Sequence, residues 1–195
     1  MSSHLKKQYQ IACFYDTETT TIGEGSNVRA FPYLFIFNDV RNCGIVDYKA
    51  GNGVISFPRT EDAALSFVLE MVNWGIENGV IPIIAAYNLM FDLQPLMNSL
   101  RSLFDFEVCA QTSTNVYTLD LLDVESGEKV LRFWDTFYLE MNGLSAIGKT
   151  AGLPKMVGDL DYSLVRTPET PLTETELGYA ARDVEVIPAY LAYLL

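Results

Sequence analysis

Two acidic residues at the end of an apolar run constrain most strongly what this chain can fold into. The run from Ile11 to Tyr15 is aliphatic and aromatic and predicts a buried strand, and Asp16 and Glu18 follow it directly. Because strand side chains alternate between two faces, both carboxylates project on the same side. They repel each other unless a cation neutralises them, and hard oxygen ligands suit Mg²⁺ or Mn²⁺. The same residues could equally form a polar strand end before the threonine-rich segment 19–21.

The size and composition of the chain describe one globular domain. With 195 residues, of which 49% are hydrophobic, the chain can bury a substantial core. No apolar run approaches the roughly 18 residues that span a membrane. The first residues lack the apolar segment of a signal peptide. We therefore expect residues 1–10 to form a flexible tail and residues 11–195 to form the domain.

The cysteines and the net charge narrow the cellular setting and the partners. Cys13, Cys43 and Cys109 lie far apart and outside paired motifs, which argues against a disulfide framework or a zinc cluster and fits the reducing cytoplasm. The formal charge of -12 counts against extended binding to duplex DNA, because phosphate contacts use Lys and Arg. It counts less against a site that grips only a strand end through metals and stacking.

Helix and strand signals alternate along the chain without repeats or a low-complexity linker. Thr60 is suited to cap a helix from Glu61, Asn78-Gly79 is a stop signal, and Thr173 with Glu176 forms a T-x-x-E capping box before the last helix. Further strands are predicted at 33–37, 44–48, 80–86, 106–112, 116–122 and 130–134, and further helices at 93–104 and 144–150. This mixture predicts a single α/β domain with a mixed sheet flanked by helices.

Two more acidic residues could join the first pair. Asp92 lies just past the end of a predicted buried strand, and Asp183 shares a helix face with Tyr179, four residues earlier. Four carboxylates at one sheet edge suit two divalent metals about 3.5–4 Å apart, and the Tyr179 hydroxyl could serve the attacking water or the phosphate. Each residue also has a plain alternative: Asp92 as a helix cap, Asn88 as a turn residue, Tyr179 as a half-buried helix residue, Asp183 as a solvated charge.

Three segments together resemble a known superfamily. Tyr15-Asp16-Thr17-Glu18-Thr19, Asn88-Leu89-Met90-Phe91-Asp92 and Tyr179-Ala180-Ala181-Arg182-Asp183 resemble the three motifs of the DEDD exonucleases, and the tyrosine of the third motif indicates the DEDDy branch. The DEDDh branch needs a histidine where Gly178 stands. The resemblance is strongest to the 3'-5' proofreading domain of protein-primed family B DNA polymerases of phages, and it covers about Ile11 to Leu195.

This resemblance implies a fold, an activity and a set of partners. The fold would be ribonuclease-H-like, and the activity would be release of nucleoside monophosphates from single-stranded DNA 3' ends during DNA replication. Two Mg²⁺ or Mn²⁺ ions would be held by Asp16, Glu18, Asp92 and Asp183, while Tyr179 would orient the water. A separate or fused DNA polymerase domain would be the protein partner, in the cytoplasm of a bacterial or phage-infected host cell.

The resemblance also implies contacts with the DNA strand, and it has departures. The implied contact residues are Thr19, Asn88, Phe91, Thr136, Phe137 and Tyr162. Phe137 replaces a leucine of the family, and Val157 stands where the phage enzymes carry a lysine. Lys155, two residues earlier, either reaches the site instead or leaves that function absent. Ribonuclease activity of the same chemistry, and a non-catalytic module for a strand end or a polymerase, therefore stay open as alternatives.

A further motif is expected to be a coincidence. Residues 143–150, Gly-Leu-Ser-Ala-Ile-Gly-Lys-Thr, match the P-loop pattern of nucleotide-binding proteins. A P-loop needs a buried strand directly before it and a helix that opens at Lys149. Here a polar segment precedes the motif, and Gly152 and Pro154 end any helix at once. Leu144 and Ile147 instead indicate the apolar face of a short helix.

Overall fold

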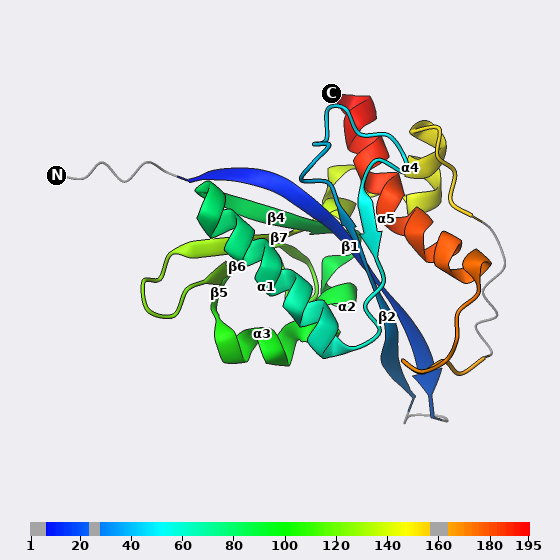
Figure 1. The fold of residues 1–195 in the computed structure, drawn as a ribbon, viewed down its shortest axis with the longest axis horizontal. Helices are drawn as coiled ribbons and strands as arrows, with labels where there is room; N and C mark the ends of the chain where they lie inside the picture. The colour runs from blue at the N-terminus through cyan, green and yellow to red at the C-terminus, as the bar shows by residue number, and fades with distance from the viewer. Residues whose placement is uncertain (1–6, 24–27, 157–163) are drawn as a thin grey trace.

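A seven-stranded mixed sheet forms the centre of the computed structural model, which describes residues 7–23, 28–156 and 164–195 (Figure 1). Its strands are β1 (Gln8–Ile22), β2 (Arg29–Asp39), β3 (Val54–Ser56), β4 (Val80–Ala86), β5 (Asp105–Ala110), β6 (Val116–Leu122) and β7 (Lys129–Asp135). They are ordered β3-β2-β1-β4-β7-β6-β5. The central strands β1, β4 and β7 run parallel, and the remaining pairs are antiparallel. The predicted single α/β domain with a ribonuclease-H-like mixed sheet is confirmed.

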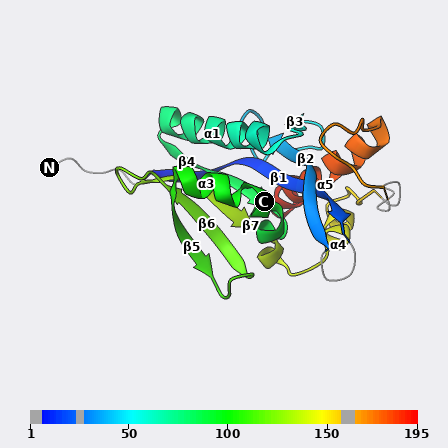
Figure 2. The same ribbon diagram turned by 90° about the horizontal axis from the view of Figure 1, so that it is seen from below.

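Helices cover both faces of this sheet. They are α1 (Glu61–Asn78), α2 (Leu89–Leu93), α3 (Met97–Leu103), α4 (Leu144–Thr150) and α5 (Glu174–Leu194), with 3₁₀ turns η2 (Gln94–Leu96) and η3 (Thr136–Leu139). One core joins α1, α2 and α3 to the sheet, and a second core joins α4 and α5 to the opposite face. Figure 2 shows α1 lying along the sheet, and both views place α4 beside α5. Each face of β1 is therefore buried under helices.

Local sequence signals set the ends of the two long helices, as predicted. The Thr60 hydroxyl accepts a hydrogen bond from the Ala63 amide, and Gly79 ends α1 in the left-handed conformation with φ 67°. At the start of α5, Thr173 and Glu176 form both halves of the capping box. The short helix predicted at 144–150 is present as α4. None of the helices among residues 7–23, 28–156 and 164–195 is long and apolar enough to cross a bilayer.

Three predicted boundaries differ from the structure. The strand predicted at 44–48 is wrong: this segment is a series of turns, in which the Gly44 amide donates to the Val40 carbonyl, and the edge strand is instead β3. Tyr48 is buried in the core and Ile45 packs against it, and together they supply the apolar signal. The helix predicted at 93–104 is divided into α2, η2 and α3, with Pro95 in the 3₁₀ turn. β1 begins at Gln8, so residues 8–10 belong to the strand rather than to a tail.

Candidate active site

Strand β1 directs two carboxylates toward α5. Asp16 and Glu18 lie on the β1 face that Phe14 shares with the α5 core, whereas Tyr15 and Thr17 point to the other face. On that other face the Tyr15 hydroxyl donates to the Asp92 backbone carbonyl at 2.8 Å. The alternation predicted from the sequence is thus present, and the second face of β1 anchors the segment that carries Asp92.

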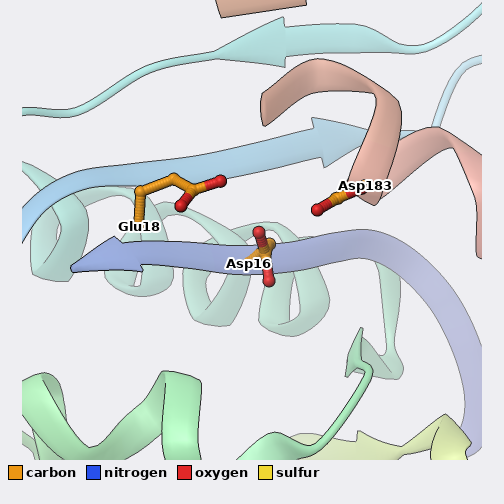
Figure 3. Close-up of side chains that lie close together, drawn as sticks. All are labelled: Asp16, Glu18 and Asp183. Atoms are coloured by element: carbon orange, nitrogen blue, oxygen red, sulfur yellow. The ribbon is translucent and has the colours of Figure 1, made fainter. Parts of the chain in front are cut away.

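Helix α5 brings a third carboxylate to the pair. Asp16, Glu18 and Asp183 each offer a carboxylate oxygen, and these oxygens all lie within 4.8 Å of one another (Figure 3). Glu18 is 9% exposed, and the Asp183 side chain is 8% exposed. Segments about 165 residues apart in the chain therefore form one acidic cluster.

Asp92 borders the same cavity but stands outside this group of three. Its side chain is 3% exposed and lies inside α2, so it does not cap a helix. Burial raises its pKa well above the usual range, and the negative charge of Asp16 raises it further. The Asp92 and Asp16 carboxylates therefore influence each other electrostatically.

A lysine occupies the acidic cluster. Lys155 Nζ lies 2.9 Å from Asp183 Oδ2 and 5.4 Å from the centre of the Tyr179 ring. Burial lowers the Lys155 pKa, but the contacts with Asp183 and Tyr179 outweigh this and raise it overall. Of the two possibilities left open by the sequence, the first is realised: Lys155 reaches the site. Val157 lies outside the described residues.

The electrostatics of the cluster favour a bound cation. Burial, followed by the charges of Glu18 and Asp183, raises the pKa of Asp16 to about 8. Burial and the Asp183 charge raise the pKa of Glu18 to about 7. Asp183 Oδ1 is buried without a hydrogen-bond partner in the described part of the chain. An acidic set with an unsatisfied oxygen and carboxylates that resist ionisation fits divalent cations, because such ions supply the missing charge and accept the free lone pair.

A cavity of about 290 Å³ opens beside the cluster. Its lining includes all four predicted carboxylates, Tyr179, Lys155, Asn88 and Phe91. Phe91 is 52% exposed, and it also borders a second hollow of about 430 Å³ that Thr19 and Pro95 line. The predicted strand contacts Thr19, Asn88 and Phe91 therefore line two neighbouring hollows, one of which holds the carboxylates.

Asp135 is a residue of the site that the sequence analysis missed. Asn88 adopts a left-handed conformation with φ 67° and gives α2 no side-chain cap. Instead the Asp135 carboxylate accepts hydrogen bonds from the Asn88 and Leu89 amides, each at 3.1 Å. This carboxylate fixes the turn that presents Asn88 and starts the helix bearing Asp92. Its position at the end of a strand parallel to β4 was the available signal.

The remaining predicted contacts have different surroundings. The Thr136 hydroxyl is buried and donates to the Ala86 carbonyl at 2.8 Å, so it joins the start of η3 to the end of β4 inside the protein. The Phe137 ring packs edge-on against Tyr87 and Tyr138. Tyr162 lies outside the described residues. The P-loop match is a coincidence, as expected: α4 begins at Leu144, and the segment before it is not a strand.

Comparisons with known proteins agree with this architecture. No family model matches the chain, and neither does any curated protein. Solved structures of phi29 DNA polymerase do match. The complex with primer-template DNA and incoming nucleotide substrates aligns with 97% of this chain and 31% of its own, at 18% identity and a TM-score of 0.71. The complex with single-stranded DNA aligns with 93% of this chain and 31% of its own, at 18% identity and a TM-score of 0.66.

The orthorhombic crystal form of phi29 DNA polymerase gives a similar result, with 17% identity and a TM-score of 0.67 over 93% of this chain and 30% of that one. The chain therefore spans about a third of the length of these polymerases. At this level of identity the comparisons establish the fold of the chain.

Proposed function

We propose that the chain is a metal-dependent 3'-5' exonuclease of the DEDDy, proofreading type, which hydrolyses single-stranded DNA ends to nucleoside monophosphates. One observation carries the proposal: Asp16, Glu18 and Asp183 converge within 4.8 Å beside a cavity that Asp92 and Tyr179 also line. This is the residue set implied by the three sequence motifs. The match of the fold to a part of phi29 DNA polymerase supports it.

The metal-binding role falls to the four carboxylates. Asp16, Glu18, Asp92 and Asp183 would hold two divalent ions, Mg²⁺ or Mn²⁺. When bound, such ions supply a hydroxide at neutral pH and stabilise the leaving oxygen of the phosphodiester. The unpartnered Oδ1 of Asp183 and the raised pKa values of Asp16 and Glu18 support this assignment.

Other side chains around the cavity would orient the reactants. We assign Tyr179 to orient the attacking water and Lys155, beside it, to hold Asp183 and approach the phosphate. Thr19, Asn88 and Phe91 would contact the strand. An aromatic ring stacked on a base contributes about 1–3 kcal/mol, and the exposed Phe91 ring suits this role.

The outer predicted contacts receive narrower roles. The Phe137 ring, which packs against two neighbouring tyrosine rings, would lie beside the bound DNA strand. Thr136 would support the cavity wall through its hydrogen bond to β4. Tyr162 is kept as a predicted stacking residue.

A labelled-strand assay tests the proposal. The purified chain should shorten a 5'-labelled single-stranded DNA in the presence of Mg²⁺ or Mn²⁺, and a chelator should stop the reaction. Asp16→Ala should abolish the shortening, because one of the carboxylates that would hold the metal ions is lost. Equal activity of Asp16→Ala and the unmodified chain would disprove the proposal. A matched RNA strand in the same assay decides between deoxyribonuclease and ribonuclease activity.

A non-catalytic module is the second candidate. The observation that favours it is the Lys155–Asp183 ion pair, since an ammonium already neutralises one carboxylate of the cluster. Such a module would bind a strand end, or a polymerase, without releasing product. Binding of labelled DNA with no nucleotide release under Mg²⁺ or Mn²⁺ is the result that would select this candidate.

The cellular setting belongs to the same proposal. We propose that the chain acts with a separate or fused DNA polymerase domain in the cytoplasm of a bacterial or phage-infected cell. The three cysteines are all free thiols in the structure, which suits a reducing compartment. Co-purification of the chain with a DNA polymerase from infected cells tests this assignment.

A further inference from the structure

Helix α5 contains a carbonyl group that the helix itself cannot satisfy. Pro188 lies inside α5 and has no N–H, so it cannot donate to the carbonyl of Val184, four residues earlier. Val184 is 1% exposed, and a buried carbonyl without a donor is costly. This carbonyl belongs to the residue next to Asp183. The break in the helix therefore lies directly beside a residue of the acidic cluster.

The sheet supplies the missing donor. Asn38 Nδ2 donates to the Val184 carbonyl at 3.0 Å and to the Tyr48 hydroxyl at 2.9 Å. A carbonyl oxygen only accepts hydrogen bonds, so the NH₂ group of the Asn38 amide, and not its oxygen, faces α5. Asn38 is fully buried on β2. Gly53 packs so tightly on this side chain that a Cβ there would lie 1.8 Å from Asn38 Oδ1. The amide is thus held in one place.

The hydrogen bond links the two sources of the acidic cluster. Asn38 pairs with Phe14 in the β1–β2 ladder, two residues before Asp16. A short path therefore runs from the carboxylates of β1, across the ladder to Asn38, and through its amide to the residue after Asp183. Besides this path, Asp183 is held by its ion pair with Lys155 and by the packing of α5 on the sheet.

We propose that Asn38 is a positioning residue, which uses the carbonyl freed by Pro188 to fix Asp183 relative to Asp16 and Glu18. The role of the tether in metal binding rests on the proposed function, whereas the tether itself does not. Asn38 contacts neither substrate nor metal; it acts through α5. The three elements of this device are an asparagine on β2, a proline in α5 and a glycine at position 53.

The first experiment measures the tether in metal-free protein. Asn38→Leu removes the donor while keeping the number and branching of the side-chain heavy atoms, and it should lower Tm by about 2–4 °C. Pro188→Ala restores an amide hydrogen to the helix. In the Pro188→Ala background, Asn38→Leu should lower Tm by less than half as much, because the amide at position 188 now donates to the Val184 carbonyl. Equal losses of Tm in the two backgrounds would overturn the tether.

The second experiment separates positioning from stability. Mn²⁺ is titrated, and the paramagnetic resonance signal of free Mn²⁺ reports its affinity. Asn38→Leu should weaken Mn²⁺ binding about tenfold, as lost supporting contacts do at other metal sites. The Asn38→Leu/Pro188→Ala double variant should recover Tm but not affinity. Recovery of both together would show a purely structural role and refute positioning.

Two further variants sharpen this result. Tyr48→Phe removes the other hydrogen bond of Asn38 and leaves the Val184 bond intact, so it should keep the Mn²⁺ affinity of the unmodified chain. Gly53→Ala pushes against the Asn38 amide and should weaken Mn²⁺ binding as Asn38→Leu does. Equal weakening by Tyr48→Phe and Asn38→Leu would contradict the proposal. If the unmodified chain binds no Mn²⁺, the proposed function fails, and the Tm comparison still decides whether the tether exists.

Discussion

The two long helices cover opposite faces of the same sheet and are built differently. Helix α1 is capped by Thr60 and Gly79, and its buried residues are apolar or small. Helix α5 has the stronger N-terminal cap, yet it contains Pro188 and carries Asp183 into its contact with the sheet. The first helix could be described almost entirely by local rules.

This difference shows where the chain accepts a cost in stability. A buried carboxylate such as Asp183 is unfavourable unless a cation and hydrogen bonds compensate it. Lys155 forms an ion pair with Asp183 Oδ2, and Asp183 Oδ1 has no hydrogen-bond partner among the described residues. Helix α1 requires no such partners. The candidate site thus lies on the helix that buries a charged residue, whereas α1 packs through apolar and small residues alone.

The largest expected effect separates the two helices by activity. Asp183→Asn should lower the rate of nucleotide release by about 10³-fold, because the proposed metal site loses one of its carboxylates. The matched control on α1, the exposed Glu77→Gln, should stay within twofold of the unmodified chain. Rates are measured on a 5'-labelled single strand. A tenth or more of full activity in Asp183→Asn would show that the reaction does not depend on the α5 carboxylate.

The next effect compares the packing of the two helices. Met71→Ala on α1 and Ile187→Ala on α5 should each lower the free energy of unfolding by about 2–5 kcal/mol, since both side chains are buried. Only Ile187 lines the cavity of the site. Chemical denaturation should therefore show similar losses, while Mn²⁺ affinity falls in Ile187→Ala alone. Equal affinities in the two variants would argue against a special role of the α5 face.

The third effect is a pH dependence that arises from the carboxylates of the acidic cluster. Folding raises the pKa of Asp16 from 3.8 to about 8 and that of Glu18 from 4.5 to about 7. Groups with raised pKa values favour the folded state at low pH, and this contribution is lost as pH rises through the folded values. Metal-free protein should therefore lose stability between about pH 4 and pH 8.

Two variants and one ion test this dependence in thermal melts. Asp16→Asn should make the decline shallower, because one of the carboxylates with a raised pKa no longer titrates, and saturating Mn²⁺ should do the same in the unmodified chain. The control Asp62→Asn, at the exposed start of α1, should leave the decline unchanged. A stability that rises between pH 4 and pH 8 without metal would contradict the prediction.

The smallest effect compares the two helix caps. Thr60→Ala and Thr173→Ala should each cost about 1 kcal/mol, or about 2–4 °C in Tm. The Thr173 hydroxyl also donates to the Glu176 carboxylate, which accepts a hydrogen bond from the Arg166 guanidinium at 2.7 Å. The Arg166 backbone amide in turn donates to the Thr20 hydroxyl, near the acidic cluster. Thr173→Ala should therefore also slow nucleotide release about twofold. Slower nucleotide release in Thr60→Ala, with no change in Thr173→Ala, would contradict the link between the α5 cap and the site.

Sequence reasoning succeeded where one residue and its near neighbours decide the outcome. The cap at Thr60, the capping box at Thr173 and the common face of Asp16 and Glu18 follow from helix and strand geometry alone. It failed at 44–48, where Tyr48 is buried by a turn rather than by a strand. A buried residue in a turn and one in a short strand leave the same hydropathy pattern.

The sequence by itself determined the class of fold and the acidic residues that could share a cation, because these depend on periodicity and on chemistry carried by each residue. The tertiary structure alone decided that Lys155 pairs with Asp183, that Asp135 holds the turn before Asp92, and that Asn38 serves the carbonyl freed by Pro188. These contacts join elements that are distant in the chain. Their geometry arises only when β1, β2 and α5 pack together, and no local pattern records it.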